Sequence, residues 1–154
     1  HRVIASTGRA SETEYLKSLG AAEILDRAEL SAPGKPLQKE RWMAAVDTVG
    51  SHTLANACAC TRERGWVTTC GMAQGLDFPA TVAPFILRGV SLIGIACSTA
   101  PMADRQFAWQ RLAELIAPAK LALMTRTIRL EEAIAASADL LAGKVRGRLL
   151  VEIR

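Results

Sequence analysis

The turn made by Thr7, Gly8 and Arg9 combines residue types that could bind a phosphate group. It follows the apolar run 3–6, which predicts a short strand, and it precedes residues 11–14, whose S-x-x-E spacing predicts a capped helix start. Backbone N–H groups at a helix start attract anions, and a guanidinium offers several donors and a permanent charge to a dianion. These residues therefore indicate an anion site at the end of the first strand.

The lack of a carboxylate in this turn indicates which anion would bind. In dinucleotide-binding folds, the end of the second strand faces the adenosine ribose, and an Asp or Glu there binds the 2′-hydroxyl of NAD. Here Thr7 and Arg9 stand in that place, which suits the 2′-phosphate of NADP. Taken alone, the same residues also fit an ordinary exposed turn, so both interpretations remain open at this point.

Two further titratable residues, Asp47 and His52, lie close together in the sequence. Asp47 follows an apolar run expected to be a strand, and His52 stands where the next helix should begin, with Ser51 or His52 as its cap. Capping and contacts to a ribose are therefore favoured over acid–base catalysis for both side chains.

The four cysteines lack the paired spacing of a structural zinc site. Cys58 and Cys60 form the one close pair, and their alanine-rich surroundings indicate small residues that pack a helix. The apolar surroundings of Cys70 and Cys97 predict ordinary buried thiols. No metal site and no disulfide are predicted.

The elements that must position these residues alternate between strand and helix. This alternation predicts an α/β fold with a doubly wound parallel sheet of the Rossmann type. The expected strands are 3–6, 22–25, 42–49, 65–71 and 90–96, and the expected helices begin near residue 11 and span 53–62. The strand at 42–49 is almost continuously apolar, which is typical of a strand covered on both faces.

Beyond residue 101 the pattern changes to longer helices. Apolar spacing predicts helices at 103–116 and 130–142, an extended segment at 123–128 and a final strand at 148–153. We assign residues 1–154 to one partial NADP-binding Rossmann domain, with about 118–130 and 146–154 expected to pack on a catalytic domain that the chain lacks.

The composition excludes several classes of protein. Hydrophobic residues make up 50% and charged residues 22% of the 154 residues, which is the balance of a soluble globule. The net charge of +4 is spread along the chain without interleaved aromatic residues, which argues against a nucleic-acid partner. No apolar stretch has the length of a membrane span or a secretory signal, so we expect a cytoplasmic protein without a membrane partner.

Four segments closely resemble one family of enzymes. They are residues 9–25, which contain EYLKSLGA, residues 46–50 (VDTVG), residues 70–73 (CGMA) and residues 84–90 (PFILRGV). Together they are similar to the acrylyl-CoA reductase branch of the medium-chain dehydrogenase/reductase superfamily, a branch often grouped with quinone oxidoreductases. The resemblance runs from about residue 2 to the C-terminus.

The resemblance implies a zinc-independent oxidoreductase that uses NADPH to reduce the carbon–carbon double bond of a short enoyl thioester, or a quinone. It implies that Thr7, Gly8 and Arg9 hold the 2′-phosphate and that Arg27 supports the adenosine phosphate side. Further cofactor contacts are implied for Met72, Ile86 and Cys97 on the nicotinamide half and for Lys144, which would close the site. No catalytic residue of the family is identified in the chain.

The sequence departs from the family pattern at the nucleotide loop. No three glycines have the G-x-G-x-x-G spacing that binds the pyrophosphate. We therefore expect a truncated Rossmann fold without its first strand and glycine-rich loop, and an isolated chain that is inactive. Because the missing strand is central, we expect the two half-sheets to pair directly or another chain to donate a strand.

Two expectations about assembly and function complete the interpretation. The strand at 90–96 is apolar on both faces, which favours a homodimer formed through it. The alternative to a reductase is a free-standing module that senses NADP(H) without catalysis. A short-chain dehydrogenase lacks support because no Tyr-x3-Lys pair occurs, and a methyltransferase would need an early glycine-rich loop.

Overall fold

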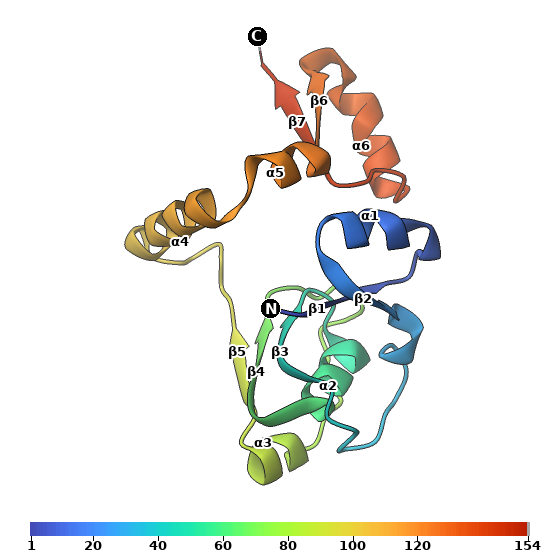
Figure 1. Ribbon diagram of the computed structural model, residues 1–154, viewed down its shortest axis with the longest axis vertical. Coiled ribbons are helices and arrows are strands. Elements are labelled where there is room, and N and C mark those ends of the chain that lie inside the picture. The colour runs from blue at the N-terminus through green and yellow to red at the C-terminus, as the bar shows by residue number, and fades with distance from the viewer. Residues whose placement is uncertain (154) are drawn as a thin grey trace. The chain divides into compact units, whose positions relative to one another are not determined.

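The computed structural model describes residues 1–153 and divides the chain into two compact units. The first unit runs from His1 to Ala100 and the second from Pro101 to Arg154 (Figure 1). Each unit is an arrangement of helices and parallel strands, as the α/β prediction requires. Arg154, the last residue of the segment expected to contact a catalytic domain, lies outside the described residues.

The first unit begins with a β-α-β arrangement. Strand β1 (Val3–Thr7) pairs in parallel with β2 (Ala21–Asp26), and η1 (Ala10–Glu12) and α1 (Thr13–Ser18) connect them. The register places Thr7 beside Asp26, so the carboxyl ends of both strands lie at one edge of the sheet. The predicted phosphate turn therefore lies beside the segment that follows β2.

The helix start after β1 differs from the prediction. A capping box by the S-x-x-E residues 11–14 is wrong, because a 3-10 turn precedes α1 and the residue at its N-cap, Glu12, makes no capping hydrogen bond through its side chain. The chain thus enters α1 through a tighter turn than the spacing indicated.

The second sheet of this unit has three parallel strands in the order β3-β4-β5. Strand β3 (Trp42–Asp47) leads through α2 (Ser51–Ala59) to β4 (Thr61–Thr69), and α3 (Ala83–Arg88) leads to β5 (Ser91–Gly94). In Figure 1 the three strands lie side by side, and both helices contact β4. This is the strand–helix alternation predicted from the sequence.

A small core fills the space between α2, α3 and this sheet. Its buried centre is formed by Leu54, Cys58, Val67 and Val90, with Ala45, Phe85 and Leu92 packed against it. Cys58 is 0% exposed and Cys60 2%, so the prediction that this pair consists of small helix-packing residues is confirmed. Burial of these side chains holds α2 and α3 on one face of the sheet.

The two sheets of the first unit share no ladder among the described residues. Strand β1 pairs with β2, whereas β3 pairs with β4, so direct pairing of the two half-sheets is wrong. The prediction that segment 42–49 is covered on both faces is wrong as well, because Val46 is 79% exposed. Strand β3 has a neighbouring strand on one side only, and its helix packs on one face.

A buried amide connects the two sheets instead. Asn56 of α2, which is 4% exposed, donates from Nδ2 to the carbonyl oxygens of Leu30 and Ala32, each at 2.8 Å. Its Oδ1 accepts a hydrogen bond of 2.5 Å from Nε2 of Gln38. One side chain of α2, the helix between β3 and β4, therefore holds the connection that follows β2.

The second unit carries its own strand–helix–strand arrangement. It contains α4 (Met102–Leu115), α5 (Pro118–Met124), β6 (Thr125–Arg129), η3 (Leu130–Glu132), α6 (Ala133–Leu141) and β7 (Arg148–Glu152). Strands β6 and β7 pair in parallel. The helices at 103–116 and 130–142 and the final strand are confirmed within a few residues.

Two short helices, α3 and α5, were not predicted. Each has six or seven residues, too few for a clear apolar period, and each begins with a proline at its first turn, Pro84 or Pro118. The proline in the first turn was the feature of the sequence that could have predicted each helix. Strand β4 also begins at Thr61 rather than 65, because residues 61–66 form an irregular stretch against β3.

We expect Asn56→Ala to lower the free energy of unfolding by about 2–4 kcal/mol, because two carbonyl groups lose their donor in a buried place. Denaturant titration followed by circular dichroism measures this change. The surface variant Gln110→Ala, on an exposed helix position, should leave the midpoint nearly unchanged. A midpoint for Asn56→Ala equal to that of the unaltered chain would show that the amide does not hold the sheets together.

Candidate functional site

The predicted phosphate turn lies against the side chain of Arg27. Thr7 ends β1, and its Oγ1 accepts a hydrogen bond of 3.1 Å from the backbone N–H of Arg9, which fixes the turn. Arg27 begins the short helix η2 (Arg27–Glu29) directly after β2, and its guanidinium lies against Gly8. The structure thus places the guanidinium of Arg27 against the predicted turn that contains Arg9.

Gly8 lets the side chain of Arg27 approach this turn closely. A Cβ added at Gly8 would lie 2.8 Å from Nη2 of Arg27, which real Cβ atoms essentially never show, and 3.1 Å from its Cζ. A side chain at residue 8 would therefore shift the flexible end of Arg27. A cationic group thus lies on backbone that carries no side chain, which suits an anion site.

The carboxylate of Asp26 lies near this turn, but it bonds to another segment. Asp26, beside Thr7 in the sheet, accepts a hydrogen bond of 2.9 Å on Oδ1 from the backbone N–H of Ala28. It caps η2, as its position before the helix predicts. Its charge is thereby engaged with the start of η2, the segment that positions Arg27.

The turn after β3 is held by a buried carboxylate. Asp47 is 5% exposed and accepts hydrogen bonds from the backbone N–H groups of Val49 and Gly50 and from the hydroxyl of Thr69. These bonds hold the turn that leads into α2, and of the helix start they engage only the N–H of the N-cap residue, Gly50. The predicted contact of Asp47 with a ribose stays a prediction. Capping by Ser51 or His52 is wrong, because Gly50, with φ of 78°, occupies the N-cap.

The loop after β4, residues 70–77, packs on this turn through its backbone. Cys70 N–H donates to the carbonyl oxygen of Asp47 at 2.9 Å, and Gln74 N–H donates to that of Val49 at 2.8 Å. A Cβ added at Gly50 would lie 3.3 Å from Cα of Met72. Met72, one of the predicted cofactor contacts, therefore lies beside the turn with its side chain exposed.

Ile86 projects from α3, and a single arginine anchors that helix. The side chain of Ile86 is exposed. Arg88 donates from Nη1 to the carbonyl oxygens of Ala59 and Thr61 and from Nη2 to that of Gln38. This guanidinium ties α3 to the end of α2, so the placement of Ile86 depends on it.

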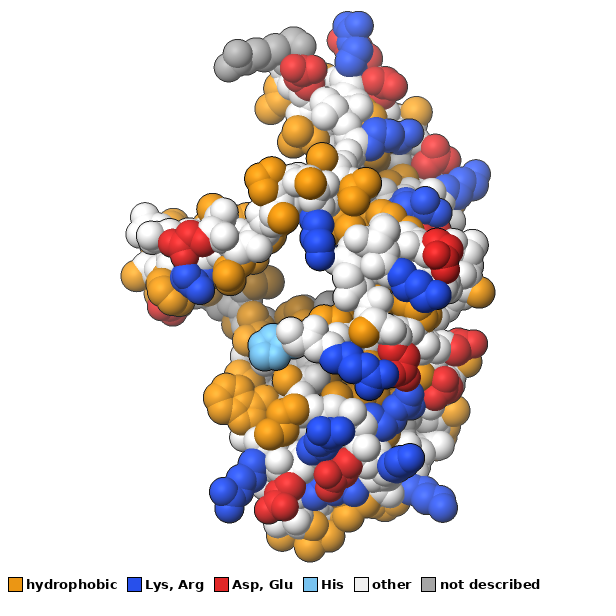
Figure 2. Space-filling model, viewed as in Figure 1, with side chains coloured by type: hydrophobic (Ala, Val, Ile, Leu, Met, Phe, Trp, Pro, Cys, Tyr) orange, Lys and Arg blue, Asp and Glu red, His pale blue; other side chains and the backbone are white. Residues whose placement is uncertain are grey.

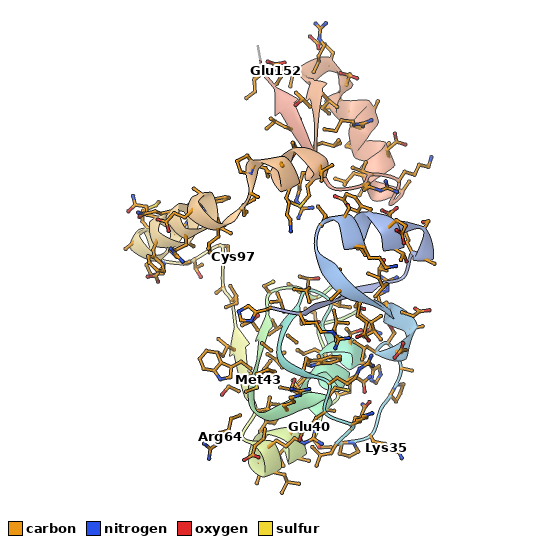
Figure 3. The ribbon with its side chains drawn as sticks, viewed as in Figure 1. Lys35, Glu40, Met43, Arg64, Cys97 and Glu152 are labelled. Atoms are coloured by element: carbon orange, nitrogen blue, oxygen red, sulfur yellow. The ribbon has the colours of Figure 1, made fainter. Side chains whose placement is uncertain are left out.

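The prediction that Cys70 and Cys97 are buried thiols is wrong. Both are exposed, and the buried pair is Cys58 and Cys60. The apolar neighbours of Cys70 and Cys97 in the sequence lie at the ends of strands, where the chain leaves the sheet. Figure 3 shows Cys97 beyond the end of β5, in the segment that follows this strand.

Lys144 belongs to the second unit, so its predicted role in closing the site stays a prediction. It follows α6, its backbone N–H donates to the carbonyl oxygen of Asp139, and its Nζ lies 3.8 Å from the Asp139 carboxylate. The structure thus brings Arg27 to the turn of Thr7, Gly8 and Arg9, whereas the roles of Met72, Ile86 and Cys97 stay predictions.

The described surface offers neither a metal site nor a bilayer span. Residues 1–153 contain no group of three or more His, Cys, Asp and Glu side chains that could hold a metal ion. No helix among them has the length and apolar character needed to cross a membrane. Figure 2 shows Lys and Arg dispersed among Asp and Glu on the visible face rather than gathered in one patch.

The fold agrees with the family to which the chain belongs. The family model described as zinc-binding dehydrogenase matches residues 1–117. The chain is therefore a member of this family, within the medium-chain dehydrogenase/reductase superfamily. The residues described here do not supply a ligand set for the zinc of the family name.

Comparisons with individual proteins show which members of the family the chain is similar to. The chain is 40% identical to the acrylyl-CoA reductase AcuI of Ruegeria pomeroyi, covering 99% of the chain and 47% of the relative. It matches the YhdH oxidoreductase of Salmonella enterica in complex with NADP with a TM-score of 0.95 and 41% identity, covering 100% of the chain and 47% of the other. The match to the yhfP protein of Bacillus subtilis with NAD bound has a TM-score of 0.94 and 39% identity, and it covers 99% of the chain and 47% of the other.

The chain therefore spans about half the length of the relatives it matches. The predicted Rossmann-type sheet and the superfamily are both shown by these comparisons. Analysis of the sequence missed the roles of Asn56, Gln74 and Arg88, which position the loops around the site. Their signal was weak, because a polar residue in an amphipathic helix or loop usually indicates a solvated face.

Burial raises the pKa of Cys58 from 9.0 to about 11, and the negative charge of Asp47 adds to the effect. Below pH 9 the thiol is protonated in the folded and unfolded chain alike, whereas above pH 9 the unfolded chain loses its proton first. We therefore expect the free energy of unfolding to fall between pH 9 and 11. Denaturant titrations at several pH values measure this slope.

The variants Cys58→Ala and Cys97→Ala separate this effect from other alkaline titrations. Replacement of the buried Cys58 should make the slope between pH 9 and 11 shallower, and replacement of the exposed Cys97 should leave it unchanged. Equal slopes for both variants would mean that the buried thiol does not contribute.

Proposed function

We propose that this chain forms the NADPH-binding part of an oxidoreductase that reduces a carbon–carbon double bond conjugated to a thioester, with a short acrylyl-CoA-like molecule as substrate. The observation that carries the proposal is the contact between the guanidinium of Arg27 and Gly8 in the turn that ends with Arg9. Two arginines at the ends of adjacent strands suit a 2′-phosphate, which carries two charges and three acceptor oxygens.

The proposed contribution of the chain is to bind and orient the cofactor. Bound NADPH would supply the hydride, and the enoyl thioester would accept it at the β carbon. Thr7, Gly8, Arg9 and Arg27 would hold the adenosine end. Met72 beside the turn after β3, together with Ile86 and Cys97, would border the nicotinamide end, and Lys144 would close the site.

The relatives support NADP-dependent reduction in different degrees. The R. pomeroyi relative is an acrylyl-CoA reductase, and the S. enterica structure contains NADP, whereas the B. subtilis structure contains NAD. A quinone remains the second substrate class, because the sequence resembles a branch that includes quinone oxidoreductases. A sensing module without catalysis is the alternative function, and turnover of acrylyl-CoA by the full-length gene product discriminates between them.

We expect the full-length protein that contains residues 1–154 to bind NADPH more tightly than NADH, and Arg9→Asp to abolish this preference. The substitution removes one cation and places a carboxylate where the 2′-phosphate would lie, which costs about tenfold or more in affinity. Isothermal titration calorimetry with both cofactors measures the preference.

The matched control is Arg62→Asp, the same charge change at an exposed position in β4. It should leave the ratio of the two affinities unaltered. Equal affinity of the unaltered protein for NADPH and NADH would remove the basis of the phosphate assignment.

We further propose a homodimer through the segment 90–96, which contains β5. In the described part of the chain β5 pairs with β4 on one side only, and Ile93 and Ile95 are 39% and 47% exposed. A paired partner strand would satisfy the free edge. Sedimentation velocity should therefore show a dimer, which Ile93→Lys should convert to monomer.

The exposed isoleucine Ile134 of α6 provides a matched control for this test. Ile134→Lys makes the same substitution outside the segment 90–96 and should leave the dimer intact. A monomer for the unaltered protein would refute the interface.

A further inference from the structure

Gln74 has no role in the family resemblance, yet its side chain forms three hydrogen bonds to two separate segments. Its Oε1 accepts from the backbone N–H of Thr53 at 3.2 Å and from the Thr53 hydroxyl at 2.9 Å. Its Nε2 donates to the carbonyl oxygen of Ser31 at 2.8 Å. One amide therefore joins the loop 70–77 to the first turn of α2 and to the connection after β2.

The orientation of this amide follows from its partners. The atom that faces the N–H of Thr53 must be an acceptor, and the atom that faces the carbonyl of Ser31 must be a donor. Both requirements are met by one rotamer of glutamine. A glutamate could serve Thr53 as well as glutamine does, but its carboxylate would repel the Ser31 carbonyl.

The two points that Gln74 contacts are themselves fixed. Thr53 lies buried in α2, and the carbonyls on either side of Ser31, those of Leu30 and Ala32, are held by Asn56. Gln74 itself lies in an exposed loop. The buried Thr53 and the connection held by Asn56 therefore fix the position of the loop 70–77, and not the reverse.

We infer that Gln74 is a positioning residue that fixes the loop 70–77, and with it Met72, for the nicotinamide half of the cofactor. The inference rests on the proposed function. Met72 is two residues from Gln74, and its Cα lies beside Gly50 in the turn after β3. Without the Gln74 amide, the loop keeps its backbone hydrogen bonds to that turn but loses its attachment to Ser31 and Thr53.

This role affects the two ends of the cofactor differently. The adenosine end would contact the turn at residues 7–9 and Arg27, none of which receives a hydrogen bond from Gln74. Asn56 still holds residues 30 and 32 when the Gln74 amide is lost, so loosening of the loop 70–77 should weaken binding of the nicotinamide end more than that of the adenosine end. A general loss of fold would weaken binding of both ends together.

The test compares NADPH with adenosine 2′,5′-bisphosphate, which has the adenosine end and lacks nicotinamide. We expect Gln74→Met to weaken NADPH binding about three- to tenfold, which is the loss of affinity expected when the hydrogen bonds of one side chain are removed. Binding of adenosine 2′,5′-bisphosphate should change by less than about twofold. Calorimetric titration of the full-length protein measures both affinities.

Gln74→Glu separates positioning of the loop from capping of α2. A carboxylate at this place caps the helix at least as well as the amide, because it lies at the positive end of the helix dipole. If capping alone mattered, NADPH binding would be retained. Positioning through Ser31 predicts that Gln74→Glu weakens NADPH binding, whereas Gln110→Met on the exposed face of α4 does not.

Each result has one meaning. Selective loss of NADPH affinity in both Gln74 variants supports the inference, and unchanged affinity or equal loss of both ligands overturns it. Binding of neither ligand by the unaltered protein would instead overturn the proposed function, and the role of Gln74 would fall with it.

Discussion

The amide of Asn56 is the interaction on which the arrangement of the first unit depends. In the described chain the β1-β2 sheet and the β3-β4-β5 sheet share no backbone ladder, so side chains must define their relation. Asn56 does this from within α2, because it is buried and engages two carbonyl oxygens of the connection after β2. The cost of leaving those carbonyls without a donor is what makes the connection specific.

The site follows from this connection. Once residues 30–32 are fixed on α2, the start of η2 is fixed as well, and Arg27 is delivered to Gly8. The same frame gives Gln74 its two attachment points. Asp47 performs the equivalent task for the turn after β3, where its carboxylate accepts two backbone N–H groups. Polar side chains in helices and strand ends thus position the loops that would surround a nucleotide.

The parts of this structure that the sequence predicted are those governed by local chemistry. The apolar runs located each strand of the first unit. The assignment of Thr7, Gly8 and Arg9 to a phosphate stays a prediction, to which the structure adds the guanidinium of Arg27 against Gly8. Prediction failed where the outcome depends on distant partners. The exposure of Val46 could not be inferred from an apolar run, because it reflects which neighbours β3 has rather than which residues it contains.

The cysteines illustrate the same limit. Cys70 has apolar neighbours in sequence but lies where the chain leaves β4, whereas Cys58 lies on the inner side of α2. Gln74 is a further case, since its partners are 21 and 43 residues away in the chain. A pattern that extends over ten residues carries no information about such contacts.

The contact between Gly8 and Arg27 has a consequence for how cofactor preference could change in this family member. Because a methyl group at residue 8 would shift the guanidinium of Arg27, a change at one of these positions affects the other. A switch from a phosphorylated to an unphosphorylated dinucleotide could begin with a glycine that itself carries no charge. A substitution at residue 8, which carries no charge, could thus change the electrostatic field at this turn by moving a neighbouring charge.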